Sequence, residues 1–534
     1  MKRNKPESEE NINPKNISPL TVSFIAFLPI FLIWIYKVVI SPRPFHVFYY
    51  DPETIYFYGG SEILHNFDLS NFDNPGIPVY LISFLIQKIL RIDVFHYDSF
   101  RLVFYATAII LYFLAFFLIA RYLILDLPFS LKLACLWFYF LAPQSLEYIN
   151  VVSPELLFFP FCMFLVITLF GGKSEIISWP RLTAASTLIG LCVSLKFTCL
   201  SFVPALLLSV ALSSEPLKTR FAKCIFSFGC VAITFMAMTM PFVPSYTLMF
   251  SRLGQFTLHK GLYGAGAVGL PTADRFGRNV VKIISSSKTY LPFLAVIVSL
   301  LGYLFFRDRD RLRKGKLRFI LVFLVSSLSI QYLAVVRSEN IALRYLLPSA
   351  AIAVGAFAFI LSKFHNYIPD KTRILIVLLI SGLLVQHAVS DIRKHDRRIS
   401  DNLGLEAELS VQLDQLGFNP QHHTIIYTWR LPKPSYALRY NIFRENFYSD
   451  IEQVYPQDGH WNPWMKEISL PRGSDRWNFA VVDKKYVDIF PAPSMRVVGS
   501  VRDYLIIVPD EIRNSSELHR QEEDRTGQAR ATTK

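Results

Sequence analysis

The sequence predicts a polytopic α-helical membrane protein of about eleven transmembrane helices, followed by a small C-terminal extracytoplasmic α/β domain. The composition is the first observation: of 534 residues, 52% are hydrophobic, 15% aromatic and only 18% charged, unlike an ordinary soluble enzyme. The second is that apolar runs near the ~20 residues needed to cross ~30 Å of hydrocarbon recur up to about residue 390. The third is a change to short β-rich runs after residue 391.

The apolar runs set the order of the predicted spans, which lie at about 18–40, 100–122, 130–143, 153–171, 221–243, 289–306, 317–336, 345–362 and 373–390. The stretch 182–212 is too long for one ordinary span and too short for two full ones. A lysine in the middle of a continuous transmembrane helix costs ~3 kcal/mol. We therefore expect two short helices that meet near Lys196 and place it at an interface or in a hydrated cavity. The shorter apolar stretch 76–90 suits a helix lying in the membrane interface.

Loop charges set the predicted orientation, because cytoplasmic loops carry an excess of Lys and Arg. With 182–212 counted as two spans and the N-terminus inside, the basic stretch 307–316 falls in the cytoplasm. Residues 41–99, 244–288 and everything after 390 then face away from the cytoplasm. We predict four parts: a disordered cytoplasmic tail 1–17, a transmembrane domain 18–390, an extracytoplasmic α/β domain 391–510 and a disordered tail 511–534.

Within the C-terminal domain, the β-rich runs lie at 423–428, 477–483, 495–500 and 504–508, and helical material lies at 406–416 and 435–440. The net charge of +14 is largely explained by topogenic loops, and no basic run interleaved with aromatics predicts nucleic-acid binding. The six cysteines lie in or beside apolar spans, and their spacing indicates neither a disulfide framework nor a metal site.

An acidic stretch follows the first predicted span. It contains Asp51 and Glu53 in Tyr-Asp-Pro-Glu, and Asp73 follows in Asp-Asn-Pro-Gly-Ile-Pro. An aspartate at the interface stays ionised and can be reached from water, so it can accept the proton of an acceptor hydroxyl. We predict these three carboxylates as candidate catalytic residues. Because Asp-Pro also often starts a turn, a structural role for Asp51 stays open.

Three further motifs follow in order along the chain. Glu155 follows a proline that opens a span, Lys196 ends a Gly-Leu-x-x-x-x-Lys pattern, and Arg344 begins Arg-Tyr-Leu-Leu-Pro. Fixed cations such as Lys196 and Arg344 could stabilise the negative charge of a departing phosphate where hydrocarbon lowers the dielectric. The structural alternatives are a helix-capping acid, a snorkelling lysine and an arginine packed beside Glu339.

Taken in this order, the motifs make residues 18 to about 365 resemble the GT-C superfamily of polytopic glycosyltransferases, in the branch of the bacterial aminoarabinose transferases and protein O-mannosyltransferases. The resemblance implies that Asp51 is the catalytic base, and that Glu155, Lys196 and Arg344 bind substrate. Two positions depart from the pattern: Asn74 replaces a lysine, and no arginine stands close after Asp51. Both positions contact the donor's phosphate in members that have them, so the resemblance indicates the reaction class more firmly than the donor.

The resemblance implies an integral-membrane glycosyltransferase that transfers a sugar from a polyprenyl-phosphate donor to an extracytoplasmic lipid, glycan or protein. It implies a multi-pass protein of the bacterial plasma (inner) membrane, with its active site on the extracytoplasmic side. The sequence establishes no cofactor; a divalent metal ion held by Glu53 or Asp73 is a hypothesis that rests on two nearby carboxylates.

Two other classes of function stay open. A lipid-linked glycan transporter or flippase would also need intramembrane charge and a hydrated cavity, although we detect no inverted repeat in the sequence. A non-catalytic envelope-assembly protein would use the C-terminal domain to recruit partners, and it would not need the acid at Asp51. The sequence identifies neither the sugar, the acceptor nor the oligomeric state.

Overall fold

The computed structural model describes most of residues 17–510. Outside the described residues lie 1–16, 48–52, 67–75, 93–95, 172–176, 252–272, most of 286–314, 338–342, 440–452 and 511–534, together with gaps of one to four residues elsewhere. Both predicted disordered tails fall almost entirely in these ranges. The chain forms two compact units. We call residues 1–40 and 59–392 the helical unit, and residues 41–58 and 393–534 the sheet unit.

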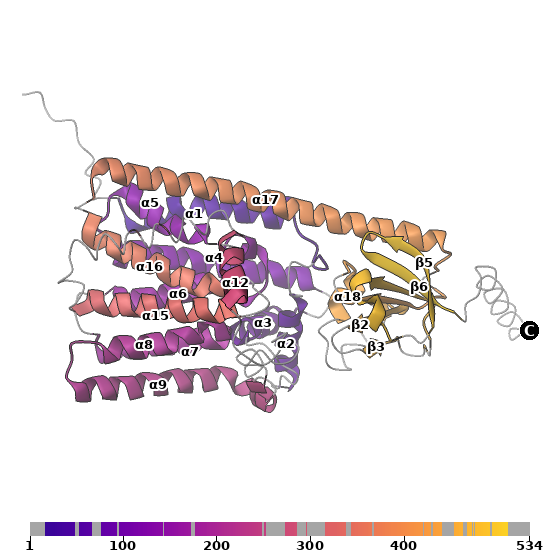
Figure 1. Cartoon of the computed structure of the whole chain (residues 1–534), viewed down its shortest axis with the longest axis horizontal. Helices are drawn as coiled ribbons and strands as arrows, with labels where there is room; N and C mark the ends of the chain where they lie inside the picture. The colour runs from indigo at the N-terminus through magenta and orange to yellow at the C-terminus, as the bar shows by residue number, and fades with distance from the viewer. Residues whose placement is uncertain are drawn as a thin grey trace, which may run out of the picture. The chain divides into compact units, whose positions relative to one another are not determined.

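The helices of the helical unit are drawn in Figure 1. In chain order they are α1 (Pro19–Ile35, continued by a π-helical turn Tyr36–Ile40), α3 (Ile77–Leu90), α4 (Tyr97–Tyr122), α5 (Phe129–Trp137), α6 (Pro154–Phe170), α7 (Trp179–Leu195), α8 (Phe202–Ala211), α9 (Leu217–Thr239), α12 (Ala273–Ser285), α15 (Gly315–Arg337) and α16 (Leu347–Phe364). Short 3₁₀ turns η3 (Phe138–Leu141), η4 (Glu147–Asn150), η5 (Phe197–Ser201), η6 (Met240–Ser245) and η7 (Leu343–Leu346) connect some of them. Helices α2 (Thr54–Asn66) and α17 (Asp370–Gln415) contribute residues to both units.

The helices confirm the prediction of a helical membrane protein. Five helical stretches in the described part of the chain are long and apolar enough to cross a membrane: Pro19–Ile40, Tyr97–Tyr122, Leu217–Val243, Leu317–Val336 and Asp370–Gln415. Shorter apolar helices occupy the predicted spans at 130–143, 153–171 and 345–362. The predicted span 289–306 lies almost entirely outside the described residues. The total of eleven spans therefore stays a prediction.

The chain breaks at Lys196, as the cost of a lysine in hydrocarbon predicts. Helix α7 ends at Leu195, Lys196 is extended with φ −162° and ψ 138°, and the chain continues through η5 into α8. The 182–212 stretch is thus two short helices joined by a non-helical residue. The apolar stretch 76–90 is also helical, as α3.

Two glycines allow helices of the helical unit to pack closely. A Cβ at Gly190 of α7 would lie 2.8 Å from the Cβ of Thr234 and 2.9 Å from the carbonyl oxygen of Val231, both on α9. A Cβ at Gly355 of α16 would overlap Val166 of α6. Helices α7 and α9, and helices α6 and α16, pack along each other. Their backbones can approach because these positions carry no side chain.

The sheet unit contains a six-stranded mixed sheet with the strand order β3-β2-β1-β4-β6-β5. The strands are β1 (Ile425–Thr428), β2 (Asp458–Asn462), β3 (Glu467–Ser469), β4 (Phe479–Asp483), β5 (Met495–Val501) and β6 (Tyr504–Pro509). β1 is parallel to β2 and β4, and the remaining pairs are antiparallel. Four strands and the short helix α18 (Pro434–Arg439) confirm predicted elements. The sequence analysis missed β2 and β3.

Helix α17 and the sheet share one hydrophobic core. Leu405, Leu409 and Leu413 of α17 pack with Tyr427 of β1 and other residues on one face of the sheet. Trp461 of β2 is fully buried on the opposite face, in edge-to-face contact with Phe490. The spacing of the leucines is that of one helical face, and burying them holds the C-terminal half of α17 against the strands.

Candidate functional site

The three predicted substrate-binding residues meet in the helical unit. Glu155 lies in the first turn of α6, where Pro154 at the first helical position sets the backbone. Lys196 occupies the break after α7, and Arg344 lies in η7, just before α16. Lys196 Nζ forms an ion pair with Glu155 Oε1, and Arg344 Nε lies 3.8 Å from the same oxygen. Residues far apart in sequence thus form one charge cluster, which we call the Glu155 cluster.

The Glu155 cluster is buried. The side chain of Glu155 is 1% exposed, that of Lys196 5% and that of Arg344 13%. The ring of Tyr345 lies under both cations, with its centroid 5.2 Å from Lys196 Nζ and 5.3 Å from Arg344 Cζ. An aromatic face attracts cations, and it does so more strongly where water is excluded.

Gln331 of α15 ties the two cation-bearing segments together, and the sequence analysis missed it. Its amide nitrogen donates to the carbonyl oxygen of Thr198 in η5 at 3.0 Å. Its amide oxygen accepts from the backbone N–H of Ser349 in α16 at 2.8 Å. The side chain is buried, so these bonds fix the turn after Lys196 relative to the helix after Arg344. The sequence signal was a lone glutamine inside an apolar span.

The arrangement can hold an anion. Two cations approach a single carboxylate oxygen in a low-dielectric environment, where each charge interaction is stronger than in water. An anionic group that joined or displaced the Glu155 carboxylate would meet both cations without any change in their position. A preorganised pair of cations of this kind stabilises a phosphate more strongly as its negative charge grows.

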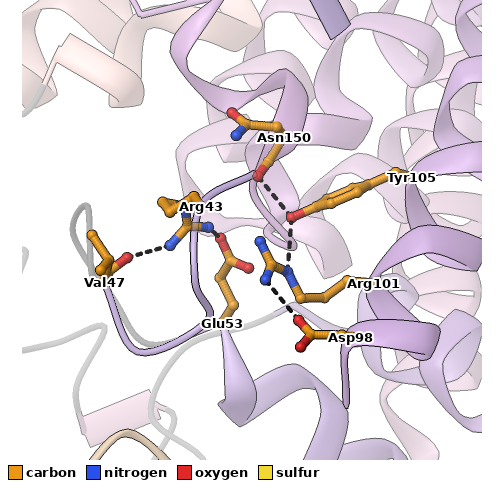
Figure 2. Close-up of polar contacts among 7 residues, drawn as sticks. All are labelled: Arg43, Val47, Glu53, Asp98, Arg101, Tyr105 and Asn150. Atoms are coloured by element: carbon orange, nitrogen blue, oxygen red, sulfur yellow. Dashed lines mark hydrogen bonds and ion pairs between the residues drawn. The ribbon is translucent and has the colours of Figure 1, made fainter. Parts of the chain in front are cut away.

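Asp51 and Glu53 lie in the acidic stretch that follows the first predicted span, and we call this stretch the acidic loop. It belongs to the sheet unit, and the structure describes one of these two carboxylates. Asp51 lies outside the described residues, as does Asp73 farther along the chain. Glu53 is buried and forms an ion pair with Arg43, while Arg43 Nη1 donates to the carbonyl oxygen of Val47 at 2.5 Å (Figure 2). The pair closes the loop by joining residues on either side of Asp51.

The sequence analysis missed Arg43, although its position carries a signal. It stands between two prolines in Ser-Pro-Arg-Pro, directly after the first predicted span. Prolines stiffen the backbone around it, so the guanidinium starts from a restricted geometry. An arginine so placed is a candidate partner for an acid in the same loop.

A further buried arginine, Arg101 of α4, was also missed. Its Nη1 lies 3.0 Å from Asp98 Oδ1, and its Nε donates to the hydroxyl of Tyr105 at 3.3 Å (Figure 2). Tyr105 in turn donates to the carbonyl oxygen of Asn150 at 2.7 Å. These bonds connect the start of α4 to the segment just before α6. Arg101 opens an apolar span, and that position was the only hint in the sequence.

The hypothesis of a divalent metal ion finds no cluster to support it in the described part of the chain. No group of three or more histidine, cysteine, aspartate or glutamate side chains is placed there to hold a metal ion. Of the two acidic residues considered for such a role, Glu53 lies in that part and Asp73 lies outside it.

The fold of this chain is similar to that of known membrane glycosyltransferases. The crystal structure of ArnT from Cupriavidus metallidurans in the apo state superposes with a TM-score of 0.54 at 11% identity, covering 91% of this chain and 97% of ArnT. ArnT bound to undecaprenyl phosphate gives 0.49 at 12% identity, over the same shares of both chains. AglB, the oligosaccharyltransferase from the archaeon Archaeoglobus fulgidus, in complex with an inhibitory peptide and a dolichol-phosphate, gives 0.46 at 12% identity, covering 88% of this chain and 69% of AglB.

The comparison with ArnT confirms the predicted GT-C resemblance at the level of the fold. No protein-family model matches the sequence. No curated protein matches it significantly either. At 11% identity the comparison establishes the architecture, and the activity has to be argued from the residues.

Proposed function

We propose that this protein is an integral-membrane glycosyltransferase that transfers a sugar from a polyprenyl-phosphate donor to an extracytoplasmic lipid, glycan or protein. The observation that carries the proposal is the Glu155 cluster. Its two cations, Lys196 and Arg344, share one buried carboxylate oxygen within a fold similar to that of ArnT. Buried cations inside a membrane protein are costly and commonly mark a site for an anionic substrate.

The cations act on the leaving group. In the reaction, the acceptor oxygen forms a bond to the anomeric carbon of the sugar, and the bond from that carbon to the phosphate oxygen breaks. The lipid phosphate departs with the bonding electron pair and gains negative charge. Lys196 and Arg344 stabilise this charge, and Glu155 holds both side chains in place before the donor arrives.

The acceptor hydroxyl loses a proton in the same reaction, and Asp51 is the proposed base. An ionised aspartate at the membrane interface can accept this proton directly. Glu53 and Asp73 are the next candidates. Glu53 is engaged by Arg43, which favours a role in holding the loop.

The proposed setting is the bacterial plasma (inner) membrane, with the acidic loop and the C-terminal domain on the extracytoplasmic side. We propose eleven spans within residues 18–390 and an extracytoplasmic domain over 391–510, since the basic stretch 307–316 is then cytoplasmic. Reporter fusions at Ser390 and Gly315 test this orientation. Extracytoplasmic activity at Ser390 and cytoplasmic activity at Gly315 support it, and the reverse pattern or cytoplasmic activity at both contradicts it.

The decisive experiment is a transfer assay on the purified full chain with defined polyprenyl-phosphate sugars and candidate acceptors. Transfer that depends on both Lys196 and Asp51 supports the proposal. Flipping of a lipid-linked glycan in vesicles without any transfer would instead indicate the transporter. The absence of both transfer and flipping from the wild-type protein would favour an assembly role.

A further inference from the structure

Residues 41–58 carry the acidic loop, and several polar contacts join this acidic-loop segment to the rest of the sheet unit. At its start, the hydroxyl of Ser41 donates to Asp396 Oδ1 at 2.9 Å, and His395 Nε2 lies 2.8 Å from the Ser41 carbonyl oxygen. At its end, the hydroxyl of Thr54 donates to the carbonyl oxygen of Ala437 in α18 at 2.9 Å. The segment is therefore held at both ends by residues that follow 393 in the chain.

Glu406 makes a further contact with this segment, through His46. It lies on the half of α17 that packs on the sheet, next to the core residue Leu405. One carboxylate oxygen is 3.3 Å from His46 Nε2 in the acidic-loop segment. The other is 3.5 Å from Lys433 Nζ, directly before α18. One side chain thus connects the loop, α17 and the approach to α18.

We propose that Glu406 is a positioning residue for the acidic loop: through His46 and Lys433 it holds the segments on either side of Asp51 in the geometry that transfer requires. This inference rests on the proposed function for its catalytic consequence, because a role in positioning matters to rate only if the loop carries the base. The physical argument is that misplacing a reacting group by about 1 Å can cost on the order of 100-fold in rate.

The chain offers a matched control two residues away. Glu408 lies on the same helix, and its carboxylate contacts Arg502 of the sheet unit, with 2.6 Å from Arg502 Nη2 to Glu408 Oε1. Glu406→Gln and Glu408→Gln therefore make the same chemical change in the same helix. Only Glu406→Gln replaces the carboxylate that lies beside His46.

The first measurement is hydrogen–deuterium exchange of the full chain in detergent, read on peptides covering 41–47 and 53–58. Glu406→Gln should speed exchange in these peptides several-fold, and Glu408→Gln should leave them as in the wild type. In the 41–47 peptide, His46→Gln should also speed exchange, and adding it to Glu406→Gln should give no further increase there, because both changes disrupt the contact between His46 and Glu406. Equal exchange in the Glu406 and Glu408 variants would overturn the proposal.

The second measurement is steady-state transfer. Glu406→Gln should lower kcat about 10- to 100-fold with little change in the KM for the polyprenyl-phosphate donor, because the donor's phosphate is bound in the helical unit. Glu408→Gln should match the wild type in both. A change in donor KM alone would contradict positioning of the base. If the wild type transfers no sugar at all, the proposed function fails, while the exchange experiment still decides whether Glu406 holds the loop.

Discussion

Glu155 in the helical unit and Glu53 in the sheet unit are both buried carboxylates next to an arginine. They differ in where their cationic partners lie in the chain. Glu155 holds cations that come from two other parts of the helical unit. Glu53 is paired with Arg43 from its own loop. A carboxylate paired within its loop fixes the shape of that loop. A carboxylate that gathers cations from distant segments fixes a site that an anion can enter.

Neither glutamate is the proposed base; Asp51 is, and the largest effect is expected there. Asp51→Asn keeps the volume of the side chain but cannot accept a proton. A positioned base contributes ~10²–10⁴-fold, or about 3–5 kcal/mol of barrier, so transfer should fall by that factor with little change in thermal stability. Turnover and Tm measured on the same preparation separate the two quantities.

An exposed aspartate provides the control for this substitution. Asp414 lies on the exposed face of α17, and Asp414→Asn should leave transfer unchanged. Near-normal transfer by Asp51→Asn would pass the role of base to Glu53 or Asp73. If all three carboxylates were dispensable, the glycosyltransferase proposal would give way to transport or assembly.

The second prediction separates stability from function in the Glu155 cluster. Glu155→Gln or Lys196→Met alone leaves a buried charge without its main partner, and such changes cost about 3–5 kcal/mol. The double variant removes both charges and should regain much of the lost stability. Its transfer activity should stay at least about 10-fold below the wild type, because a cation that stabilises the leaving phosphate is still missing.

Unfolding in denaturant and transfer rate are measured for the two single variants and the double variant. An active double variant would show that the Glu155 cluster is only structural. It would also remove the main support for a phosphate site at the break after α7.

The third prediction applies the same test to the loop pair, with the opposite expectation. Arg43→Met and Glu53→Gln should each destabilise the loop, because each leaves a buried charge. The double variant Arg43→Met with Glu53→Met should recover both stability and transfer, to within about 10-fold of the wild type, because apolar side chains of similar size can replace a structural ion pair.

Transfer by the double variant is the informative quantity here. A fully inactive double variant with wild-type stability would give Glu53 a direct part in the chemistry. The loop pair and the Glu155 cluster would then both take part in the reaction.

The contrast also shows what the sequence could predict. The break at Lys196 follows from the cost of a charge in hydrocarbon, which is a local property of one segment. The predicted strands at 477–483 and 504–508 carry runs of apolar and β-branched residues. Strand β2 reads Asp-Gly-His-Trp-Asn, and nothing in that pattern indicates a strand. It forms because β1 offers a parallel edge and Trp461 can be buried.

The contacts between the site residues could not be predicted from the sequence, because they depend on long-range packing. Glu155, Lys196 and Arg344 were each singled out by motif, but their meeting depends on how helices far apart in the chain pack. The sequence analysis predicted a span at 373–390 and helical material at 406–416, but it did not join them into the single helix α17. That helix carries Glu406 to the acidic-loop segment.

The smallest effect is expected for the exposed ion pair between Glu408 and Arg502, in contrast to the buried pairs of Glu155 and Glu53. Hydrogen bonds from Arg502 lower the pKa of Glu408 below its ordinary value of about 4.5. A lowered folded-state pKa stabilises the fold above the unfolded-state pKa, and this contribution is lost as the pH falls through the folded-state pKa. The stability difference between wild type and Glu408→Gln should therefore be constant above about pH 5 and shrink in more acidic solution.

Thermal unfolding of both proteins in detergent at about pH 7 and at about pH 3.5 measures this difference. The effect should be small, because exposed ion pairs contribute little and are screened by salt. Arg502→Gln should abolish the same pH dependence, since the pKa of Glu408 is lowered chiefly by the hydrogen bonds that Arg502 donates. A difference that grows as the pH falls would mean that Glu408 is destabilised when ionised, and it would disqualify Glu408→Gln as the neutral control for Glu406.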